Sequence, residues 1–320
     1  MYILEILDYI KKMTNKKPLF SIVIPINNEK ENILPLNERI HSTMRKMKTS
    51  YEVIMVDDGS TDGSTEILKK IKKNIIIIFR KNFGQSSALD AGIKVATGDY
   101  IITLDGDGQN DPVDIPKMYE YLINDDLDVV CGWRKVRKDT ASKRIISNGA
   151  RVLRRILVDD GIHDSGCTLR IYKQDCFEDL DLYGELHRMI PALLKWRGYK
   201  VGEIEVSHHE RQFGVSKYGW QRTIKGFLDM IYIWFWRKYA SKPLHIFGGL
   251  GLLLTSLGLM TATILLVLRL FFEYSLSDKI WPLFSMMLIL VGLQLLLTGL
   301  LAASNIENGK KKYFIRNIKK

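Results

Sequence analysis

Short apolar runs alternate with amphipathic stretches along residues 18–130. The runs have the length and the β-branched content of buried strands, and the stretches between them repeat apolar residues at helical spacing. This alternation predicts an α/β domain built on a doubly wound, mostly parallel sheet. The expected strands are Phe20–Ile26, Glu52–Val56, Ile75–Phe79, Tyr100–Leu104 and Asp128–Cys131. The expected helices cover about Glu29–Lys46, the stretch that follows Asn82–Gln85 and ends at Thr97, and Glu185–Arg197.

The last third of the chain follows a different pattern. Ile246–Leu268 and Ile280–Ile306 contain no charged residue. As helices, both are long enough to cross the roughly 30 Å hydrocarbon core of a bilayer. A core helix of a soluble domain rarely lacks a polar face over such a length. We therefore expect a transmembrane hairpin, joined by the short connector Arg269–Lys279.

Basic residues flank this hairpin on its outer sides. Arg237, Lys238 and Lys242 precede it, and a lysine-rich tail follows it. By the positive-inside rule, both flanks and both termini are expected in the cytoplasm, at the inner or plasma membrane. The expected segments are an N-terminal amphipathic segment (1–17), a cytoplasmic catalytic domain (18–219), interfacial amphipathic helices (220–242), two transmembrane helices (243–306) and a basic cytoplasmic tail (307–320).

The net charge of +11 predicts an anionic partner, either nucleic acid, anionic lipid or a phosphorylated substrate. Aromatic and basic residues are interleaved over Trp220–Tyr239, directly before the first predicted span. Next to a span, this pattern is typical of interfacial helices rather than of a surface that stacks nucleic-acid bases. Cys131, Cys167 and Cys176 lack CxxC spacing and are expected to be reduced thiols.

Polar residues follow four of the predicted strands where each strand ends. In an open α/β sheet, the carboxyl edge of the strands is where ligands bind. The carboxylates of Asp105 and Asp107 and the amide oxygen of Gln109 form the hard oxygen set that Mg²⁺ or Mn²⁺ prefers, although a capped turn is the alternative for any one of these ends. No GxGxxG or P-loop motif is present, so dinucleotide and P-loop nucleotide binding are not supported. The four ends are Pro25 with Asn27-Asn28-Glu29, Asp57-Asp58-Gly59-Ser60, Asn82–Gln85 and Asp105-Gly106-Asp107-Gly108-Gln109.

Three long motifs occur in order: IVIP to EKEN (22–32), VDDGSTDGSTE (56–66) and KNFGQSSALDAGIKVATGDYIITLDGDGQNDP (81–112). With them, the chain resembles inverting glycosyltransferases of family 2 with the GT-A fold. It is most similar to the polyprenyl-phosphate glycosyltransferases, such as the bactoprenol glucosyltransferases and the dolichyl-phosphate mannose synthases. The resemblance covers about residues 18–220, and the two apolar segments match the bactoprenol type.

The resemblance implies a role for each matching position. In this family, acids after the first two strands hold the nucleotide base and ribose, and a DxDxQ motif holds the metal and the diphosphate. A nucleotide diphosphate leaves readily only when a divalent cation neutralises its developing charge. The implied metal ligands are Asp105, Asp107 and Gln109, and the implied nucleotide-sugar contacts are Pro25, Asn27, Glu29, Asp57, Asp58, Gln85, Asp105 and Gly106.

The second half of the domain matches the acceptor side of the family. Asp164 begins a DSG turn expected to face the sugar, and Arg170 is expected to pair inside the domain. Glu185 is expected either to contact sugar hydroxyls or to stabilise a helix start through the dipole. The histidines 187, 208 and 209 lack a third ligand at metal spacing, so zinc is not expected. The implied phosphate-binding residues are Arg134, Lys143, Arg144, Ser147, Arg211, Ser216 and Lys217, with solvated surface positions the alternative for Lys143 and Arg144, and the implied catalytic residues are Asp107, Arg134 and Asp164.

These positions predict a metal-dependent inverting transfer of a hexose from a nucleotide sugar, UDP-glucose or a similar donor, to a polyprenyl phosphate. The alternatives are a GDP-mannose-dependent polyprenyl-phosphate mannose synthase, a processive polysaccharide synthase and a non-catalytic scaffold that binds sugar nucleotides. The processive enzyme should show a QxxRW segment and more spans, and the scaffold should lack metal or acceptor residues. A homo-oligomer is a further expectation, because small residues in the spans allow close helix approach. Those small residues are Gly248, Gly251, Gly258, Gly292 and Gly299.

Overall fold

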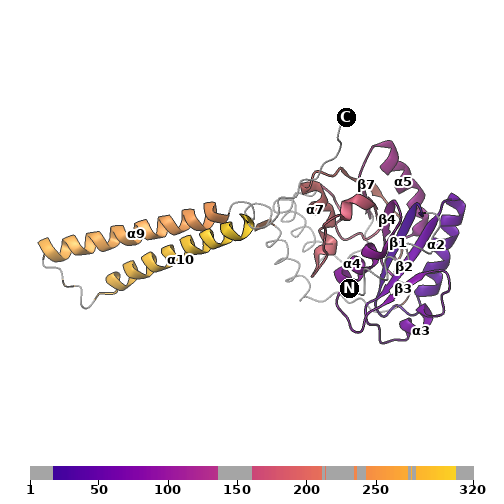
Figure 1. Ribbon diagram of the computed structural model, residues 1–320, viewed down its shortest axis with the longest axis horizontal. Coiled ribbons are helices and arrows are strands. Elements are labelled where there is room, and N and C mark those ends of the chain that lie inside the picture. The colour runs from indigo at the N-terminus through magenta and orange to yellow at the C-terminus, as the bar shows by residue number, and fades with distance from the viewer. Residues whose placement is uncertain are drawn as a thin grey trace. The chain divides into compact units, whose positions relative to one another are not determined.

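The computed structural model of the protein describes residues 17–135, 161–210, 213, 234–235, 243–272, 275 and 279–307. The chain forms two compact units, residues 1–229 and 230–320. The first unit contains the sheet and its covering helices, and the second contains the two long C-terminal helices (Figure 1).

A seven-stranded sheet forms the centre of the first unit, in the order β3-β2-β1-β4-β6-β5-β7. Strand β1 pairs in parallel with β2 and β4, β2 pairs with β3, and β5 pairs with β7. Strand β6 runs antiparallel to both of its neighbours, β4 and β5. The predicted mostly parallel sheet is therefore confirmed. The strands are β1 (Phe20–Ile26), β2 (Tyr51–Asp57), β3 (Ile75–Ile78), β4 (Tyr100–Thr103), β5 (Val129–Trp133), β6 (Arg170–Lys173) and β7 (Val201–Glu205).

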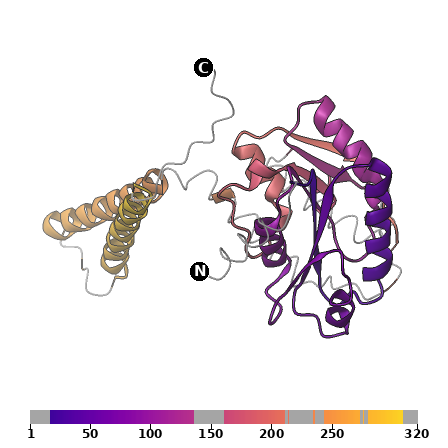
Figure 2. The same ribbon diagram turned by 45° about the vertical axis from the view of Figure 1, so that its right-hand side comes forward.

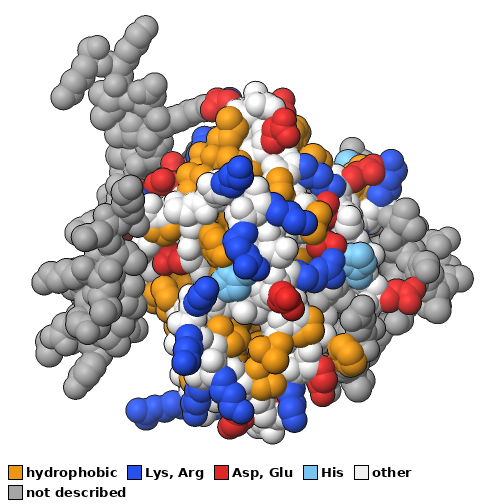
Figure 3. Space-filling view, turned by 90° about the vertical axis from the view of Figure 1, so that its right-hand side faces the viewer, with side chains coloured by type: hydrophobic (Ala, Val, Ile, Leu, Met, Phe, Trp, Pro, Cys, Tyr) orange, Lys and Arg blue, Asp and Glu red, His pale blue; other side chains and the backbone are white. Residues whose placement is uncertain are grey.

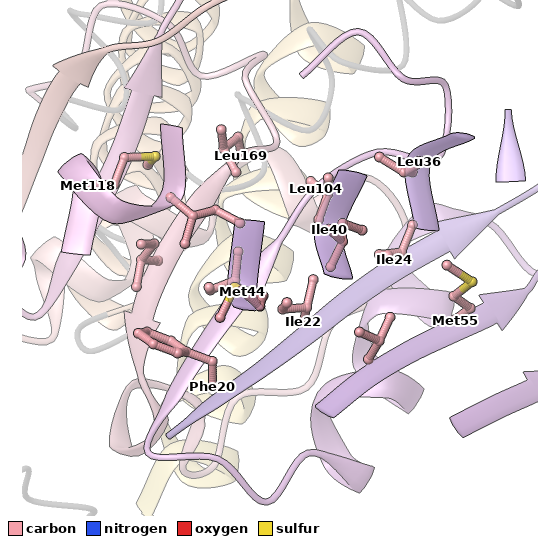
Figure 4. Packing of buried hydrophobic residues seen from close by; sticks show 14 of the residues in the cluster. Phe20, Ile22, Ile24, Leu36, Ile40, Met44, Met55, Leu104, Met118 and Leu169 are labelled. Atoms are coloured by element: carbon pink, nitrogen blue, oxygen red, sulfur yellow. The ribbon is translucent and has the colours of Figure 1, made fainter. Parts of the chain in front are cut away.

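Helices cover both faces of this sheet (Figure 2). On one face, Ile22 and Ile24 of β1 belong to an apolar cluster with Leu36 and Ile40 of α2 (Figure 4). On the other face, Val23 of β1 belongs to a second cluster, which includes residues of α4 and α7. Successive side chains of a strand point to opposite faces, so an uninterrupted apolar strand such as β1 needs cover on both. The described helices of this unit are α2 (Ile33–Met47), α3 (Ser64–Leu68), α4 (Gln85–Val95), α5 (Ile115–Asn124) and α7 (Ile190–Trp196), with 3₁₀ turns η1 (Pro112–Asp114), η2 (Gln174–Phe177) and η3 (Leu186–Arg188).

Two expected helices differ from the observed ones at their starts. The helix expected from about Glu29 begins at Ile33, because Asn28 has a φ of +55° and residues 30–32 form a turn. The helix expected from Glu185 is the 3₁₀ turn η3 followed by α7. Pro191 lies in the first turn of α7, where its missing N–H breaks no helical hydrogen bond.

The second unit contains α9 (Pro243–Phe271) and α10 (Trp281–Glu307). By length and composition, the helical segments 243–271 and 281–304 are long and apolar enough to cross a membrane. Most of their side chains are exposed, unlike those of a core helix in a soluble protein. The two predicted C-terminal apolar helices are therefore present, and the expected interfacial helices at 220–242 fall almost entirely outside the described residues.

Glycines line the seam between α9 and α10. A Cβ on Gly251 would lie 2.6 Å from the carbonyl oxygen of Gly292, and one on Gly258 would lie 2.9 Å from the backbone nitrogen of Ile289. A Cβ on Gly299 would lie 3.2 Å from the backbone nitrogen of Gly248. The small residues thus allow close packing within one chain. Their expected use in contacts between chains, and with it the homo-oligomer, stays a prediction.

Basic side chains are dispersed over the face of the molecule seen in Figure 3, where they lie among acidic and apolar ones. The net charge of +11 is therefore not gathered into a single basic groove on the described part of that face.

Candidate active site

The carboxyl ends of β1 to β4 lie at one edge of the sheet, because these four strands are parallel neighbours. Val23 of β1 is paired with Thr103 of β4, so Asp105 leaves β4 level with Pro25 of β1. The four polar strand ends recognised in the sequence therefore meet at this edge, where open α/β sheets bind ligands.

Hydrogen bonds join the loop after β1 to the loop after β2. The Asn27 amide donates to the carbonyl oxygen of Asp58 at 2.8 Å. The backbone nitrogen of Asn28 donates to the Ser60 hydroxyl at 3.0 Å, and the Asn28 amide oxygen accepts from the backbone nitrogen of Thr61 at 2.7 Å. Asn28 can hold its positive φ because asparagine is among the residues that tolerate the left-handed region. These hydrogen bonds hold the loop after β1 and the loop after β2 together on one side of the site.

Asp57 and Asp58 are both buried, and both bind neighbouring loop segments. One oxygen of Asp57 accepts from the backbone nitrogen of Ser60 at 2.9 Å, and the other accepts from the Thr65 hydroxyl at 2.5 Å. Asp58 accepts from the backbone nitrogens of Phe83 at 2.6 Å and Gly84 at 3.0 Å. Asp58 thereby ties the end of β2 to the loop after β3. Their nucleotide-binding role stays a prediction, beside this bracing role.

Gly106 packs directly against the end of β1. A Cβ at this position would lie 2.5 Å from Cδ1 of Ile26, 3.1 Å from the carbonyl oxygen of Pro25 and 3.8 Å from Cγ of Glu29. Glu29 itself is 8% exposed and accepts a hydrogen bond from the Asn32 amide at 2.7 Å. Glycine is needed here for close approach, and it brings the Asp105–Gln109 segment against the predicted nucleotide contacts.

Replacing Gly106 by alanine is expected to destabilise the catalytic unit by about 1–3 kcal/mol, the usual cost of overpacking a filled site. The added methyl must displace either Ile26 or the Asp105–Asp107 backbone. Thermal unfolding of the purified variant checks the stability, and a donor titration checks for a raised KM. A variant with unchanged stability and KM would contradict the close packing described above.

Asp105 and Asp107 form the centre of the site. The Gln85 amide donates to one oxygen of Asp105 at 2.7 Å, so the residue that begins α4 contacts the end of β4. Asp107 is 8% exposed, and its Oδ1 accepts from the backbone nitrogen of Gln109 at 3.1 Å. Burial, and then the negative charge of Asp107, raise the pKa of Asp105 to about 6. The two carboxylates therefore lie close enough for the charge of one to raise the pKa of the other.

The oxygen donors of this cluster fit Mg²⁺ or Mn²⁺. Mg²⁺ is usually held by one or two carboxylates together with substrate phosphates, rather than by a cage of protein side chains. Within the described ranges, no group of three or more His, Cys, Asp or Glu side chains is arranged to hold a metal. Asp105 and Asp107 match that mode of binding, because a cation would relieve the repulsion that raises the pKa of Asp105. The Gln109 amide and substrate oxygens would complete the coordination.

Arg134 and Asp164 form a bidentate ion pair beside Asp105 and Asp107. Nε of Arg134 donates to Oδ2 of Asp164 at 2.6 Å, and Nη2 donates to Oδ1 at 2.9 Å. The side chains are 13% and 7% exposed, respectively. The charge of Arg134 also reaches Asp105, whose pKa it lowers against the larger raising effects of burial and Asp107. Two residues predicted to act on the acceptor and the sugar are therefore brought together.

Arg170 lies inside the domain, as expected, and its partners among the described residues are neutral oxygens rather than a carboxylate. Its guanidinium, 2% exposed, donates to the carbonyl oxygens of Ser165 at 2.6 Å and His187 at 3.0 Å. Glu185 lies at the start of η3, where it pairs with Arg188 at 3.4 Å.

Two contacts of the site have no signal in the sequence. The Ser86 hydroxyl lies 2.8 Å from Nδ1 of His187, which joins α4 to η3 in the interior. His209 lies 2.9 Å from the carboxylate of Asp111, two residues beyond Gln109. From the sequence, His187 and His209 could be judged only as zinc ligands, and that role lacked a third ligand. Their hydrogen-bond partners, Ser86 and Asp111, lie about a hundred positions away along the chain.

Six of the predicted acceptor residues lie outside the described residues, and their roles remain predictions. They are Lys143, Arg144, Ser147, Arg211, Ser216 and Lys217.

Curated relatives are similar to nearly the whole chain. Dodecaprenyl-phosphate galacturonate synthase from Rhizobium johnstonii is 39% identical over 294 residues, which cover 88% of this chain and 86% of the relative. Undecaprenyl-phosphate 4-deoxy-4-formamido-L-arabinose transferase from Pectobacterium atrosepticum is 35% identical over 288 residues, with the same two coverages.

Solved structures with low sequence identity share the fold. Mannosyl-3-phosphoglycerate synthase from Rubrobacter xylanophilus aligns with a TM-score of 0.55 at 13% identity, over 72% of this chain and 77% of that one. The UDP complex of glucosyl-3-phosphoglycerate synthase from Mycobacterium tuberculosis aligns with a TM-score of 0.51 at 15% identity, over 72% and 82%. The family model described as Glycosyl transferase family 2 matches residues 21–181. With these matches, and with the acidic carboxyl edge of its sheet, the chain belongs to glycosyltransferase family 2 and has the GT-A fold.

Proposed function

We propose that the protein transfers a sugar from a nucleotide sugar to a polyprenyl phosphate at the cytoplasmic face of a membrane. The main support is similarity that extends well beyond the catalytic family region. The match to dodecaprenyl-phosphate galacturonate synthase covers 88% of the chain, whereas the family model ends at residue 181. The two apolar helices α9 and α10 would hold such an enzyme where its lipid acceptor lies.

The donor in this proposal is UDP-linked. Its sugar is glucose or one of the sugars named for the relatives, galacturonate or 4-deoxy-4-formamido-L-arabinose. GDP-mannose is the alternative donor. Glu29, Asp57 and Asp58 would hold the nucleoside, with Pro25, Asn27, Gln85 and Gly106 around it.

Positioning and charge stabilisation provide most of the catalysis in this proposal. A phosphate monoester has a second pKa of about 6, so the lipid phosphate attacks as an anion and needs no strong general base. Arg134, with the basic residues at 143–144 and 211–217, would orient that anion for in-line attack and inversion. Because both oxygens of Asp164 accept from Arg134, we infer that Asp164 orients the guanidinium rather than taking up a proton.

The metal in this proposal is Mg²⁺ or Mn²⁺, held by Asp105, Asp107 and Gln109. When bound, it supplies electrostatic stabilisation of the charge that develops on the departing diphosphate. Gln85 keeps Asp105 in place through its 2.7 Å hydrogen bond, so the donor set is preorganised before substrate arrives.

The predicted segment plan belongs to the same proposal. The catalytic domain 18–219 and both termini would lie in the cytoplasm, with residues 220–242 at the membrane surface and 243–306 crossing it twice. Cysteine labelling of the 269–279 connector and of the C-terminal tail in intact cells tests the plan. Labelling of the tail, rather than the connector, from outside would contradict it.

A transfer assay tests the proposed reaction. The full chain in detergent, given undecaprenyl phosphate and a panel of labelled UDP-glucose, UDP-galacturonate, UDP-4-deoxy-4-formamido-L-arabinose and GDP-mannose, is expected to convert one UDP sugar into a lipid product. EDTA should abolish the product, and excess Mg²⁺ or Mn²⁺ should restore it.

The panel also separates the alternatives. Lipid product from GDP-mannose alone would favour a mannose synthase, and a growing polymer would favour a processive synthase. Failure of every donor with the lipid acceptor would overturn the proposed reaction.

A further inference from the structure

The segment after β7 lies along the segment that follows the predicted metal site. Ser207 donates its backbone N–H to Oδ2 of Asp114 at 2.6 Å. His208 forms an isolated antiparallel bridge with Asn110, and the backbone nitrogen of His209 donates to the carbonyl oxygen of Gln109 at 2.9 Å. Three successive residues are therefore joined to a stretch that begins at Gln109.

The side chain of Gln109 is held by the same segment. Its Nε2 donates a long hydrogen bond, 3.4 Å, to the carbonyl oxygen of His209. A carbonyl oxygen only accepts, so the NH₂ end of the carboxamide must face His209. The amide oxygen is then directed away from His209 and remains available as a ligand for a hard cation.

The side chain of His209 anchors this arrangement. Its Nε2 lies 2.9 Å from Oδ2 of Asp111, and a carboxylate accepts hydrogen bonds, so Nε2 is the donor. Asp111 is 8% exposed and is itself held by Arg39 of α2 and by the backbone nitrogen of Val113. The imidazole thus fixes the backbone of residue 209 to a rigid point beside Gln109.

We propose that His209 is a positioning residue for the cation ligand Gln109. Its imidazole is hydrogen-bonded to Asp111. Its backbone nitrogen then fixes the backbone carbonyl of Gln109, and its carbonyl oxygen fixes the carboxamide of Gln109. The inference rests on the proposed metal role of the Asp105–Gln109 segment. Groups that orient a metal ligand typically change metal affinity or activity by about 10–100-fold when they are removed.

Mn²⁺ binding to the full chain in detergent, measured from the EPR signal of free Mn²⁺ without any substrate, tests the proposal. His209→Ala is expected to weaken Mn²⁺ binding by about 10-fold. His209→Gln places an N–H near the position of Nε2 and is expected to restore most of the affinity. Ser207→Ala is the matched control, because the exposed Ser207 side chain lies on the same segment and its backbone N–H is retained.

A second measurement separates positioning from general damage to the fold. In the transfer assay, His209→Ala is expected to need about 10-fold more Mn²⁺ for half-maximal rate and to recover most of its kcat at saturating Mn²⁺. A kcat that stays low at saturating Mn²⁺, or an alanine variant that binds Mn²⁺ as tightly as wild type, overturns the proposal. So do a wild-type chain that binds no Mn²⁺ and a glutamine variant as weak as alanine. Mn²⁺ binding with the expected ranking but no lipid product from any donor would overturn the proposed reaction alone.

Discussion

Replacing Asp107 by alanine is expected to lower kcat by about 10³-fold, the scale of effect when one preorganised group that stabilises transition-state charge is removed. Asp107 lies two residues from Asp105, whose pKa is raised by burial and by the charge of Asp107. The variant loses one of two carboxylates available to hold the cation against the leaving diphosphate. Transfer assays over a range of Mg²⁺ and Mn²⁺ concentrations measure the loss.

The same variant is expected to fold normally. Removing Asp107 relieves its repulsion with Asp105, so the midpoint of thermal unfolding should stay the same or rise, as is common where a site trades stability for function. Asp107→Asn keeps the shape without the charge and should be nearly as inactive. Asp125→Ala, at an exposed position after α5, is the control and should retain full activity. Near-normal kcat in Asp107→Ala would remove this residue from the metal site.

Replacing either Arg134 or Asp164 by alanine is expected to destabilise the catalytic unit by about 3–5 kcal/mol, because each change leaves the other charge buried without its partner. The pair has two short hydrogen bonds, and both side chains are largely buried. Urea unfolding of the two single variants and the double variant measures the effect. The double variant should cost clearly less than the sum of the single ones, since no unpaired charge remains.

A neighbouring pair supplies the control for this prediction. Lys135 and Glu205 also form an ion pair, but their side chains are 61% and 53% exposed. Lys135→Ala should therefore change stability by no more than about 1 kcal/mol. Arg134→Lys keeps the charge but cannot form the bidentate hydrogen bonds to Asp164, so the variant should lose activity as well as stability. Additive losses in the double variant would show that the two residues do not act as a pair.

Much of the fold could be predicted because it follows from local patterns. The apolar content of strands such as β1 and the helical spacing between strands predicted the layered sheet, and the uncharged stretches before and after Arg269–Lys279 predicted the two long helices. The predicted boundaries failed where single backbone choices intervene. Asn28 with positive φ delays the start of α2, and the segment 185–197 divides into the 3₁₀ turn η3 and the helix α7, which has Pro191 in its first turn.

The antiparallel strand β6 could not be predicted in the same way. Arg170–Lys173 is short, and its pairing with β4 joins residues about seventy positions apart. The position of a strand in a sheet depends on which edge remains to be covered once the other strands have paired, and no local pattern records that.

For the site, parallel strands must end at the same edge of a sheet, so the sequence alone was enough to bring Asp57, Asp58, Asp105 and Asp107 to one edge. The hydrogen-bond partners of the site residues could be identified only from the folded structure. The contacts of Arg134 with Asp164 and of His209 with Asp111 and Gln109 join segments 30 to 100 positions apart, and they depend on how the loops pack. The glycines of α9 and α10 likewise indicated close helix approach, but only the packed hairpin shows which backbone atoms of the neighbouring helix they approach.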